Sequence, residues 1–88
     1  MRLDLFLKSS RLCARRTVAQ QLCEANLVSV NGHPGKASTA VKPGDELAIH
    51  RRDRVTRVRV LLLPNSRQTS RSEAATLYEI VSEEKLEG

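Results

Sequence analysis

The sequence predicts a small α+β domain, in which two N-terminal helices pack on a small, bent antiparallel sheet and a short C-terminal helix follows. Three observations predict this class. Apolar residues recur at helical spacing before residue 26, strand-like alternation with turn dipeptides occupies residues 28–63, and helical spacing returns after residue 72. Because the chain has 88 residues, of which 40% are apolar, we expect a thin core.

The first element is a short helix. Leu3, Phe6 and Leu7 stand at i, i+3 and i+4, so "RLDLFLK" predicts a helix with Leu5 on its exposed side. The polar stretch "SSRLCA" then breaks the pattern, and we interpret Cys13 as a small loop residue.

The second helix is defined by its phase. Its apolar arc consists of four residues, Val18, Ala19, Leu22 and Ala25. Extended backwards, this arc would contain Arg15 and Arg11, although unpaired arginines rarely face a core. We therefore predict that the helix begins at Arg15 or Arg16, that Arg11 precedes it, and that Asn26 forms a left-handed C-terminal cap. Cys23 lies on the apolar side and is predicted to be a core residue.

The strands follow between turn signals. "LVSVNG" predicts a strand through Val28 and Val30 that ends at the tight-turn pair Asn31–Gly32, and "HPGKAS" predicts a loop. Pro43–Gly44 predicts a type II turn before a strand with Leu47 and Ile49 inward. "RRDR" then forms a hairpin tip. The next strand, "VTRVRVLLL", is predicted to end at Pro64. Its inward-facing residues are Val58, Val60 and Leu62.

The C-terminal part is predicted to be a linker and a helix. "NSRQTSRS" is polar and predicts a mobile link, and Ser70 with Glu73 has the form of a capping box. A helix over residues 72–82 would align four residues on one stripe, Ala74, Leu77, Tyr78 and Val81, before the frayed acidic end "EEKLEG". We thus expect a domain over residues 1–63, with residues 64–88 packing on it or extending it.

The charge favours a polyanionic partner. The net charge is +5, with twelve basic and five acidic side chains in residues 1–63 and three and five in residues 64–88. A membrane partner is disfavoured, because no basic helix carries bulky apolar anchors and no segment has the pattern of a signal peptide or membrane span. Two cysteines without a C-x-x-C motif predict no zinc site and suit a reducing cytoplasm.

An enzyme is not predicted. His33 and His50 have no nucleophile at a recognisable spacing, the aspartates are scattered, and no phosphate-binding glycine loop or cofactor motif is present.

The basic cluster at the second helix is the candidate site. A helix that starts at Arg15 or Arg16 directs its free N–H groups and positive dipole end to the place where these guanidinium groups lie, which favours phosphate. Lys8 and the Thr17 hydroxyl can join them. The alternative is that both arginines only form ion pairs with Glu24 or the acidic C-terminal residues.

Two further basic groups carry less information. Lys36 and Lys42 lie near the predicted hairpin and are weak candidates for the same surface. The arginines between residues 51 and 59 form either a second basic face or a charged guard of an exposed strand edge.

Four ordered pieces of residues 1–50, "RLDLFL", "RRTVA", "VSVNGHPGKAS" and "VKPGDEL", resemble the S4 RNA-binding domain. The resemblance implies an RNA surface formed by the start of the second helix and the hairpin loop. Matched position by position, it implies RNA contacts from eight residues, Arg2, Arg11, Arg15, Arg16, Thr17, Asn31, Lys36 and Ser38. The chain departs from the family pattern at Asn26, where Gly is usual, and at Leu5, where a polar or basic residue is common.

Over nearly its whole length, including "SEAATLYEI", the chain is similar to the stand-alone S4 family of bacterial ribosome-associated quality control. That resemblance implies a monomer that binds the large ribosomal subunit, contacts its rRNA and peptidyl-tRNA, and supports alanine tailing with RqcH, a NEMF-family factor. The runner-up is the small heat-shock S4 protein that rescues obstructed large subunits. A protein-interaction module that docks an acidic partner through the basic face remains the alternative of a different class.

Overall fold

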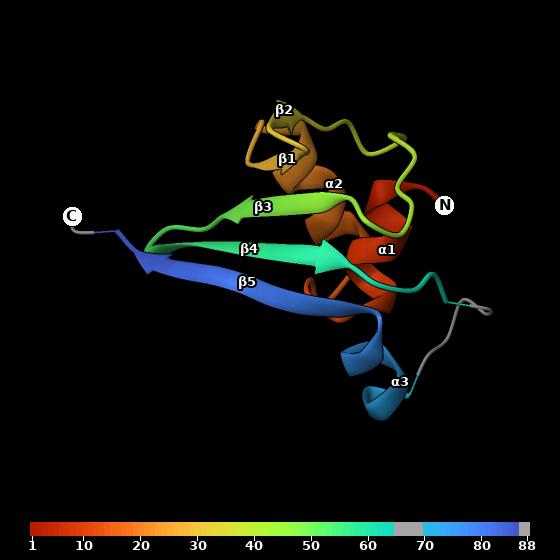
Figure 1. Cartoon of the computed structure of the whole chain (residues 1–88). Helices are drawn as coiled ribbons and strands as arrows, with labels where there is room; N and C mark the ends of the chain where they lie inside the picture. Colours follow the sequence, from red (N-terminus) through yellow and green to blue (C-terminus); the bar gives the residue numbers. More distant parts are fainter. Residues whose placement is uncertain (65–69, 87–88) are drawn as a thin grey trace.

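The computed structural model describes residues 1–64 and 70–86. This part of the chain forms three helices and an antiparallel sheet with the strand order β2-β1-β3-β4-β5 (Figure 1). The helices are α1 (Leu3–Ser9), α2 (Arg16–Glu24) and α3 (Arg71–Thr76). The strands are β1 (Val28–Val30), β2 (His33–Pro34), β3 (Glu46–His50), β4 (Arg54–Val60) and β5 (Tyr78–Lys85).

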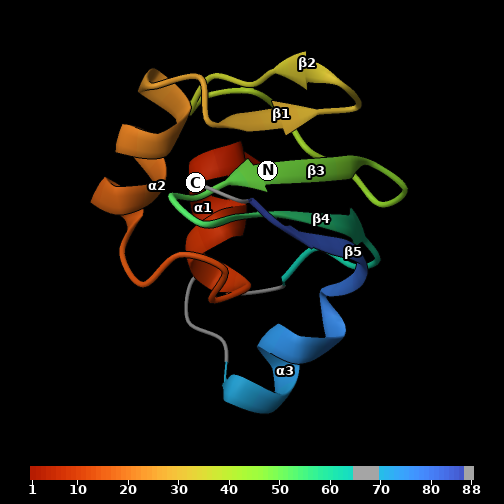
Figure 2. The same ribbon diagram turned by 90° about the vertical axis from the view of Figure 1, so that its left-hand side faces the viewer.

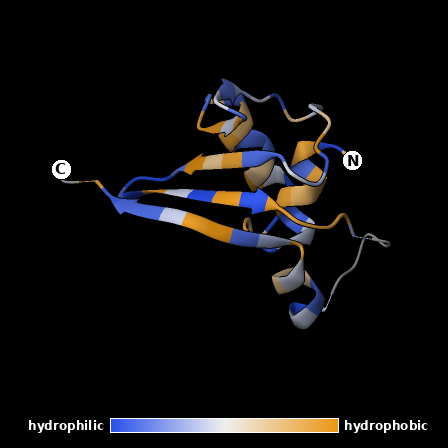
Figure 3. Cartoon of the chain, in the orientation of Figure 1, coloured by the Kyte–Doolittle hydropathy of each residue, from blue (hydrophilic) through white to orange (hydrophobic). Residues whose placement is uncertain are grey.

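The core lies between one face of the sheet and the first two helices. Figure 2 shows α1 and α2 against this face, with α3 beyond β5. The apolar and polar residues alternate along β4 (Figure 3), so that one set faces the helices. The side chains without solvent exposure come from both layers and include Leu3, Phe6, Leu7, Val28, Leu47, Ile49 and Val58.

Helix α1 confirms the predicted spacing, because Leu3, Phe6 and Leu7 are all buried. Leu5 is half-buried rather than exposed. Cys13 does lie in the connection after this helix, but its side chain is a buried member of the core. The connection therefore contributes to packing as well as to chain reversal.

Helix α2 begins where its phase predicts. Its first residue is Arg16, Arg15 is the N-cap, and Asn26 has a φ of 59°, the left-handed value expected of a C-terminal cap. The predicted apolar arc is wrong in part: Ala19 and Cys23 are buried, whereas Val18 is 39% exposed and Ala25 is exposed. The helix is rotated so that Ala19 and Cys23, rather than Val18 and Ala25, face the core.

The first strands differ from prediction in detail. Asn31 and Gly32 both have positive φ and form the predicted tight turn, but His33 and Pro34, predicted as loop, pair with β1 as strand β2. Leu47 and Ile49 face inward from β3, as predicted.

Strand β4 ends at Val60 rather than at Pro64. After Val60 the backbone turns towards the end of α3, and the Leu61 N–H donates to the Leu77 carbonyl at 2.8 Å. Leu62 consequently lies outside the core with 56% of its surface exposed.

The predicted C-terminal helix is wrong from Tyr78 onwards. Ser70 caps α3 by accepting from the Glu73 N–H at 3.1 Å, and Ala74 and Leu77 are buried as predicted. From Tyr78 the chain instead pairs with β4 along its length, with a register shift beside Arg57. Long-range ladder bonds outweigh the helical spacing here. Most of the predicted mobile link, residues 65–69, lies outside the described residues.

Candidate nucleic-acid interface

The N-terminus is joined to the loop that follows β2. The Leu3 N–H donates to the Thr39 carbonyl at 2.8 Å, and the Val41 N–H donates to the Met1 carbonyl at 2.8 Å. Between them, Arg2 and Ala40 form an isolated antiparallel bridge. This pairing holds the loop with Lys36 and Ser38 beside the first turn of α1.

Gly35 makes the close approach of this loop possible. A Cβ at this position would lie 2.8 Å from Leu3 Cδ2 and 3.0 Å from Val30 Cγ2, which is closer than carbon atoms pack. Its N–H donates to the Val28 carbonyl at 2.9 Å. A side chain here would have to displace these two core side chains, so glycine favours the close passage of the chain into the Lys36–Ser38 loop.

Asp4 is the centre of the site. Its side chain is inaccessible to solvent and accepts hydrogen bonds from Arg2 Nε at 3.2 Å, Arg16 Nε at 3.0 Å and Gln20 Nε2 at 3.0 Å. It also accepts from the Leu5 N–H at 2.8 Å, which caps the first turn of α1. One buried carboxylate thus connects α1 with α2 and orients two arginines.

Hydrogen bonds to the charged form, rather than burial, determine the direction in which the pKa of Asp4 shifts. Burial by itself raises the pKa of Asp4, but the bonds from Gln20, Arg16, Arg2 and the Leu5 N–H together lower the pKa from 3.8 to about 2. Asp4 is therefore a stable anion at neutral pH, held by two partly exposed guanidinium groups.

The N-terminus of α2 is open to an anion. The side chain of its N-cap residue, Arg15, makes no capping hydrogen bond, and its first turn contains no acidic residue, while Arg15, Arg16 and Thr17 are exposed. Among the hydrogen bonds of the described residues, Arg16 donates to Asp4 through Nε only, so its two Nη groups keep their donors for a ligand. The free N–H groups and the helix dipole add to this positive field. The arrangement can bind phosphate.

The same surface continues along α2. Arg2, Lys36 and Ser38 line a shallow pocket of about 410 Å³ next to the C-terminal half of the helix, together with Glu24 and Asn26. The structure therefore places Arg2, Lys36 and Ser38 around one pocket and connects Arg2 to Arg16 through Asp4. Arg15 and Thr17 adjoin Arg16 at the start of α2. We call these six residues the α2 flank.

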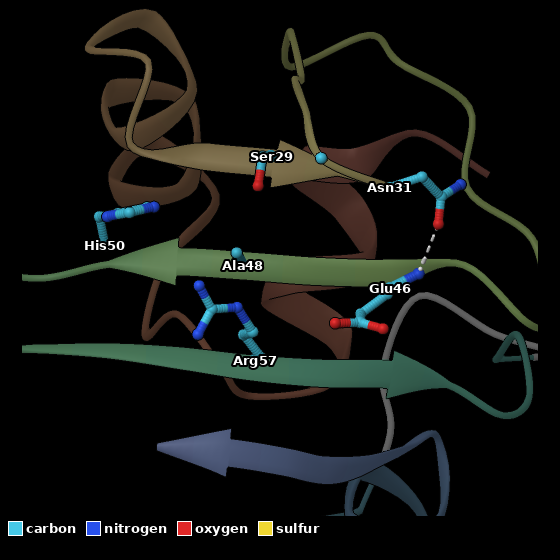
Figure 4. A pocket seen from close by; sticks show the side chains of 7 residues that line it. Ser29, Asn31, Glu46, Ala48, His50 and Arg57 are labelled. Atoms are coloured by element: carbon cyan, nitrogen blue, oxygen red, sulfur yellow. Dashed lines mark hydrogen bonds between the residues drawn. The ribbon is translucent and has the colours of Figure 1, made fainter. Parts of the chain in front are cut away.

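Asn31 and Lys42 lie elsewhere, around a different pocket. The Asn31 amide donates to Asp45 Oδ1 at 3.1 Å. It also accepts from the Glu46 N–H at 2.9 Å, as Figure 4 shows. Asp45 also accepts from the Lys42 N–H at 3.0 Å. The side chain of Asn31 thus holds the turn in place, while the Lys42 ammonium forms no ion pair with the described residues.

Lys8 and Arg11 lie at the other end of α1. Lys8 is half-buried in its last turn, and Arg11 follows with a φ of 62°, its N–H donating to the Lys8 carbonyl at 3.0 Å. They extend the positive charge beyond the α2 flank, along the connection that leads to Arg15.

The arginines of β4 correct both sequence interpretations of that segment. Strand β5 covers β4, so β4 is not an edge. Its arginines do not form a free basic face either, because each meets a glutamate of β5. The pairs are Arg54–Glu83 at 3.7 Å, Arg57–Glu84 at 3.4 Å and Arg59–Glu79 at 2.8 Å. The acidic C-terminal residues therefore neutralise β4 and leave Arg15 and Arg16 to the α2 flank.

A second depression lies on the open face of the sheet. Figure 4 shows Ser29, Ala48, His50 and Arg57 around it, with Glu46 at one end. Its charges are mixed, and none of the arginines at the start of α2 lines it. The α2 flank is the better candidate for a polyanion.

Other chemistry finds little support in the described residues. No group of three or more His, Cys, Asp or Glu side chains there is placed to hold a metal ion. Burial, with Asp4 nearby, raises the pKa of Cys23 to about 11, and burial also raises the pKa of Cys13 despite the charge of Arg51. Across residues 1–64 and 70–86, no helix combines the length and hydrophobicity needed to cross a membrane.

Sequence reasoning missed Asp4 and Gln20. Asp4 looked like one of several scattered aspartates, although a carboxylate in the first turn of an otherwise apolar helix is a signal of a capping or buried charge. Gln20 stands one turn after Arg16, on the same flank of α2.

The comparisons with known proteins now bear on this site. The profile of the S4 domain family matches residues 1–47. The chain is 46% identical over 86 residues to the RQC P-site tRNA stabilizing factor of Bacillus subtilis, covering 98% of both chains. It is 47% identical over 87 residues to the protein of the same name from Halalkalibacterium halodurans, covering 98% of this chain and 96% of that one. Its fold is similar to trimeric Heat Shock Protein 15 of Vibrio cholerae, with a TM-score of 0.83, 25% identity and coverage of 93% and 82%.

Proposed function

We propose, since this chain belongs to the S4 domain family and within it to the RQC P-site tRNA stabilizing factors, that it binds RNA on the large ribosomal subunit as a non-enzymatic factor of ribosome-associated quality control. It contacts peptidyl-tRNA and large-subunit rRNA in the cytoplasm, as a monomer before it binds. The observation that carries this proposal is the α2 flank, where a buried Asp4 orients Arg2 and Arg16 beside an uncapped helix N-terminus.

The contacts are suited to a folded RNA backbone. Arginine forks grip phosphate oxygens with two bonds, and the Thr17 and Ser38 hydroxyls can reach further oxygens or a ribose 2′-OH. Aromatic stacking has little part, since the chain has one Phe and one Tyr, and Phe6 is buried. We therefore propose recognition of shape and phosphate positions rather than of single-stranded bases.

In this role the protein holds the tRNA on the split large subunit while RqcH, the NEMF-family factor, directs template-free addition of alanine to the stalled chain. The names of the relatives, which refer to the P-site tRNA, support the first part of this statement. The alanine-tailing step and the partner are carried by the resemblance described above.

The decisive experiment compares single arginine variants. Arg15→Ala removes a guanidinium that forms no ion pair with the described residues, so the fold is unaffected, and we expect binding to large subunits with peptidyl-tRNA to weaken about tenfold. The plot of log affinity against log salt should also lose about one unit of slope. Arg71→Ala, at the exposed start of α3, changes the same charge away from the α2 flank and is the control.

Co-sedimentation with large subunits, followed by sequencing of the crosslinked RNA, gives the readout. Equal binding of Arg15→Ala, Arg16→Ala and the unaltered protein at physiological salt would refute the site. Enrichment of small-subunit rRNA or mRNA would refute the proposed target. Association that survives complete RNA digestion would favour docking on an acidic protein instead.

A second candidate function is rescue of obstructed large subunits by a heat-shock-type S4 protein, which the fold similarity to Heat Shock Protein 15 favours. The acidic β5 argues against it, because the resemblance associates that group with a basic C-terminal extension. Reconstituted tailing separates the two: the first proposal requires that omission of this protein reduces alanine addition by RqcH.

A further inference from the structure

An apolar groove lies on the side of α2 that is turned away from Asp4. The connection between α1 and α2 contributes Leu12 and Ala14, α2 contributes Val18 and Leu22, and Leu27 closes the groove before β1. The volume of this groove is about 340 Å³. Val18 and Leu27 keep 39% and 37% of their surface exposed, although the protein has a small core to fill. These aliphatic side chains therefore form a surface that the described part of the chain leaves partly uncovered.

The groove is separate from the α2 flank. On an α-helix, Arg16 and Val18 point about 200° apart, and Gln20 and Leu22 are separated by the same angle. Arg16 and Gln20 contact Asp4 on one side of α2, while Val18 and Leu22 line the groove on the other. A ligand in the groove would leave the α2 flank accessible.

The rim of the groove is positively charged. It is formed by His50 at the end of β3 and by Arg51 and Arg52 in the connection to β4, which Figure 2 shows reaching towards α2. The Arg51 guanidinium donates to the Leu12 carbonyl, which fixes it across the end of the groove. Within the described residues neither Arg51 nor Arg52 forms an ion pair, with the neighbouring Asp53 or with any other carboxylate.

We propose that this groove docks an acidic amphipathic helix of a partner protein, with leucine-like side chains in the groove and carboxylates on Arg51 and Arg52. Charge complementarity identifies the acidic character, and aliphatic walls identify the anchors, because helices dock through residues at i, i+3 and i+4 in grooves of this kind. A nucleic-acid base suits the groove less well, since no Phe, Tyr or Trp ring lines it and its walls are aliphatic.

The test needs no RNA, so its failure is distinguishable from a failure of the proposed function. A synthetic helical peptide of about 15 residues, with leucines along one face and glutamates elsewhere, is titrated into the isotope-labelled full chain and followed by amide chemical shifts. We expect shifts at Val18, Leu22, Leu27 and Arg52, and none at Arg16 or Lys36. A peptide with lysines in place of the glutamates should produce none of them.

Two variants sharpen the test. Val18→Asp places a carboxylate on the exposed wall of the groove. It should weaken binding of the acidic peptide at least about tenfold, because a leucine of the peptide would remove water from the new carboxylate. Gln21→Asp makes the same charge change on the exposed side of α2, outside the groove, and should leave the affinity within about twofold. Amide spectra of the free variants report directly whether both remain folded.

Four results would overturn the proposal. They are the absence of shifts at about 1 mM acidic peptide, shifts confined to the α2 flank, equal binding of the lysine peptide, and equal losses for Val18→Asp and Gln21→Asp. Sedimentation equilibrium of the free protein covers the remaining occupant: a dimer that Val18→Asp dissolves would assign the groove to a second copy. Broadening of the groove resonances by a short RNA, with no effect of the peptide, would assign it to RNA.

Discussion

Replacing Asp4 by Asn tests whether one buried carboxylate holds the two N-terminal helices together. The substitution keeps the shape of the side chain but removes the negative charge of the carboxylate that accepts hydrogen bonds from Arg2, Arg16 and Gln20. The pKa of Asp4 falls from 3.8 to about 2 on folding, and each unit corresponds to about 1.4 kcal/mol, so the charged form contributes about 2 kcal/mol at pH 7. For a chain of this size that loss lowers the melting temperature by about 8–16 °C.

The pH dependence gives this prediction its sign. Because folding depresses the pKa of Asp4, its stabilisation is complete above the unfolded value and is lost as the pH falls towards the folded value. The difference in unfolding free energy between the unaltered protein and Asp4→Asn should therefore be about 2 kcal/mol at pH 7 and about half of that at pH 3.

Urea unfolding followed by circular dichroism at several pH values measures this difference. Asp53→Asn, at the exposed hairpin tip, is the control and should change stability by less than about 0.5 kcal/mol. Equal stability of Asp4→Asn and the unaltered protein at pH 7 would refute this role of Asp4. So would a difference in unfolding free energy that does not become smaller as the pH falls.

Three further predictions follow from single contacts. Gly35→Ala should destabilise the fold by about 1–3 kcal/mol, because the new methyl group would overlap Leu3; a neutral effect in thermal unfolding would contradict the packing described. Ser70→Ala should cost about 1 kcal/mol through loss of the α3 cap, and α3 amides should then exchange hydrogen faster; unchanged exchange would argue against the cap. Cys13 and Cys23 should resist alkylation by iodoacetamide at pH 8 until urea unfolds the chain, because burial raises the pKa of both thiols. Mass spectrometry detects the alkylation, and rapid alkylation of the folded protein would contradict this.

The start of α2 was predictable because helical phase and the cost of burying unpaired arginines lead to the same residue. The phase did not determine how far the helix is rotated about its axis, so Val18 was expected in the core and lies in the groove instead. Packing of α2 against α1 and the core, which buries Ala19 and Cys23, decided that rotation.

The C-terminal strand could not be predicted from local pattern. Residues 72–82 satisfy a helical stripe, and the ladder with β4 that overrides it joins residues about twenty or more positions apart. The role of Asp4 has the same origin, because Arg16 and Gln20 reach it only after α1 and α2 have packed. The sequence therefore proposed the basic residues of the candidate site, while tertiary contacts determine which of them lie near one another and which are oriented by Asp4.

The cross-strand pairs between β4 and β5 also have a kinetic consequence. They make one edge of the sheet nearly neutral, and β5 is the strand farthest from β2 in the sheet order, whereas α2 packs beside β1. The net charge of +5 is therefore distributed unevenly, which gives the molecule an electric dipole. In the field of a polyanion such a molecule rotates before contact, so that encounters begin with α2 foremost. Replacing the glutamates of β5 by lysines would leave the α2 flank intact and yet slow association with RNA. More collisions would then begin with β5, rather than α2, facing the polyanion.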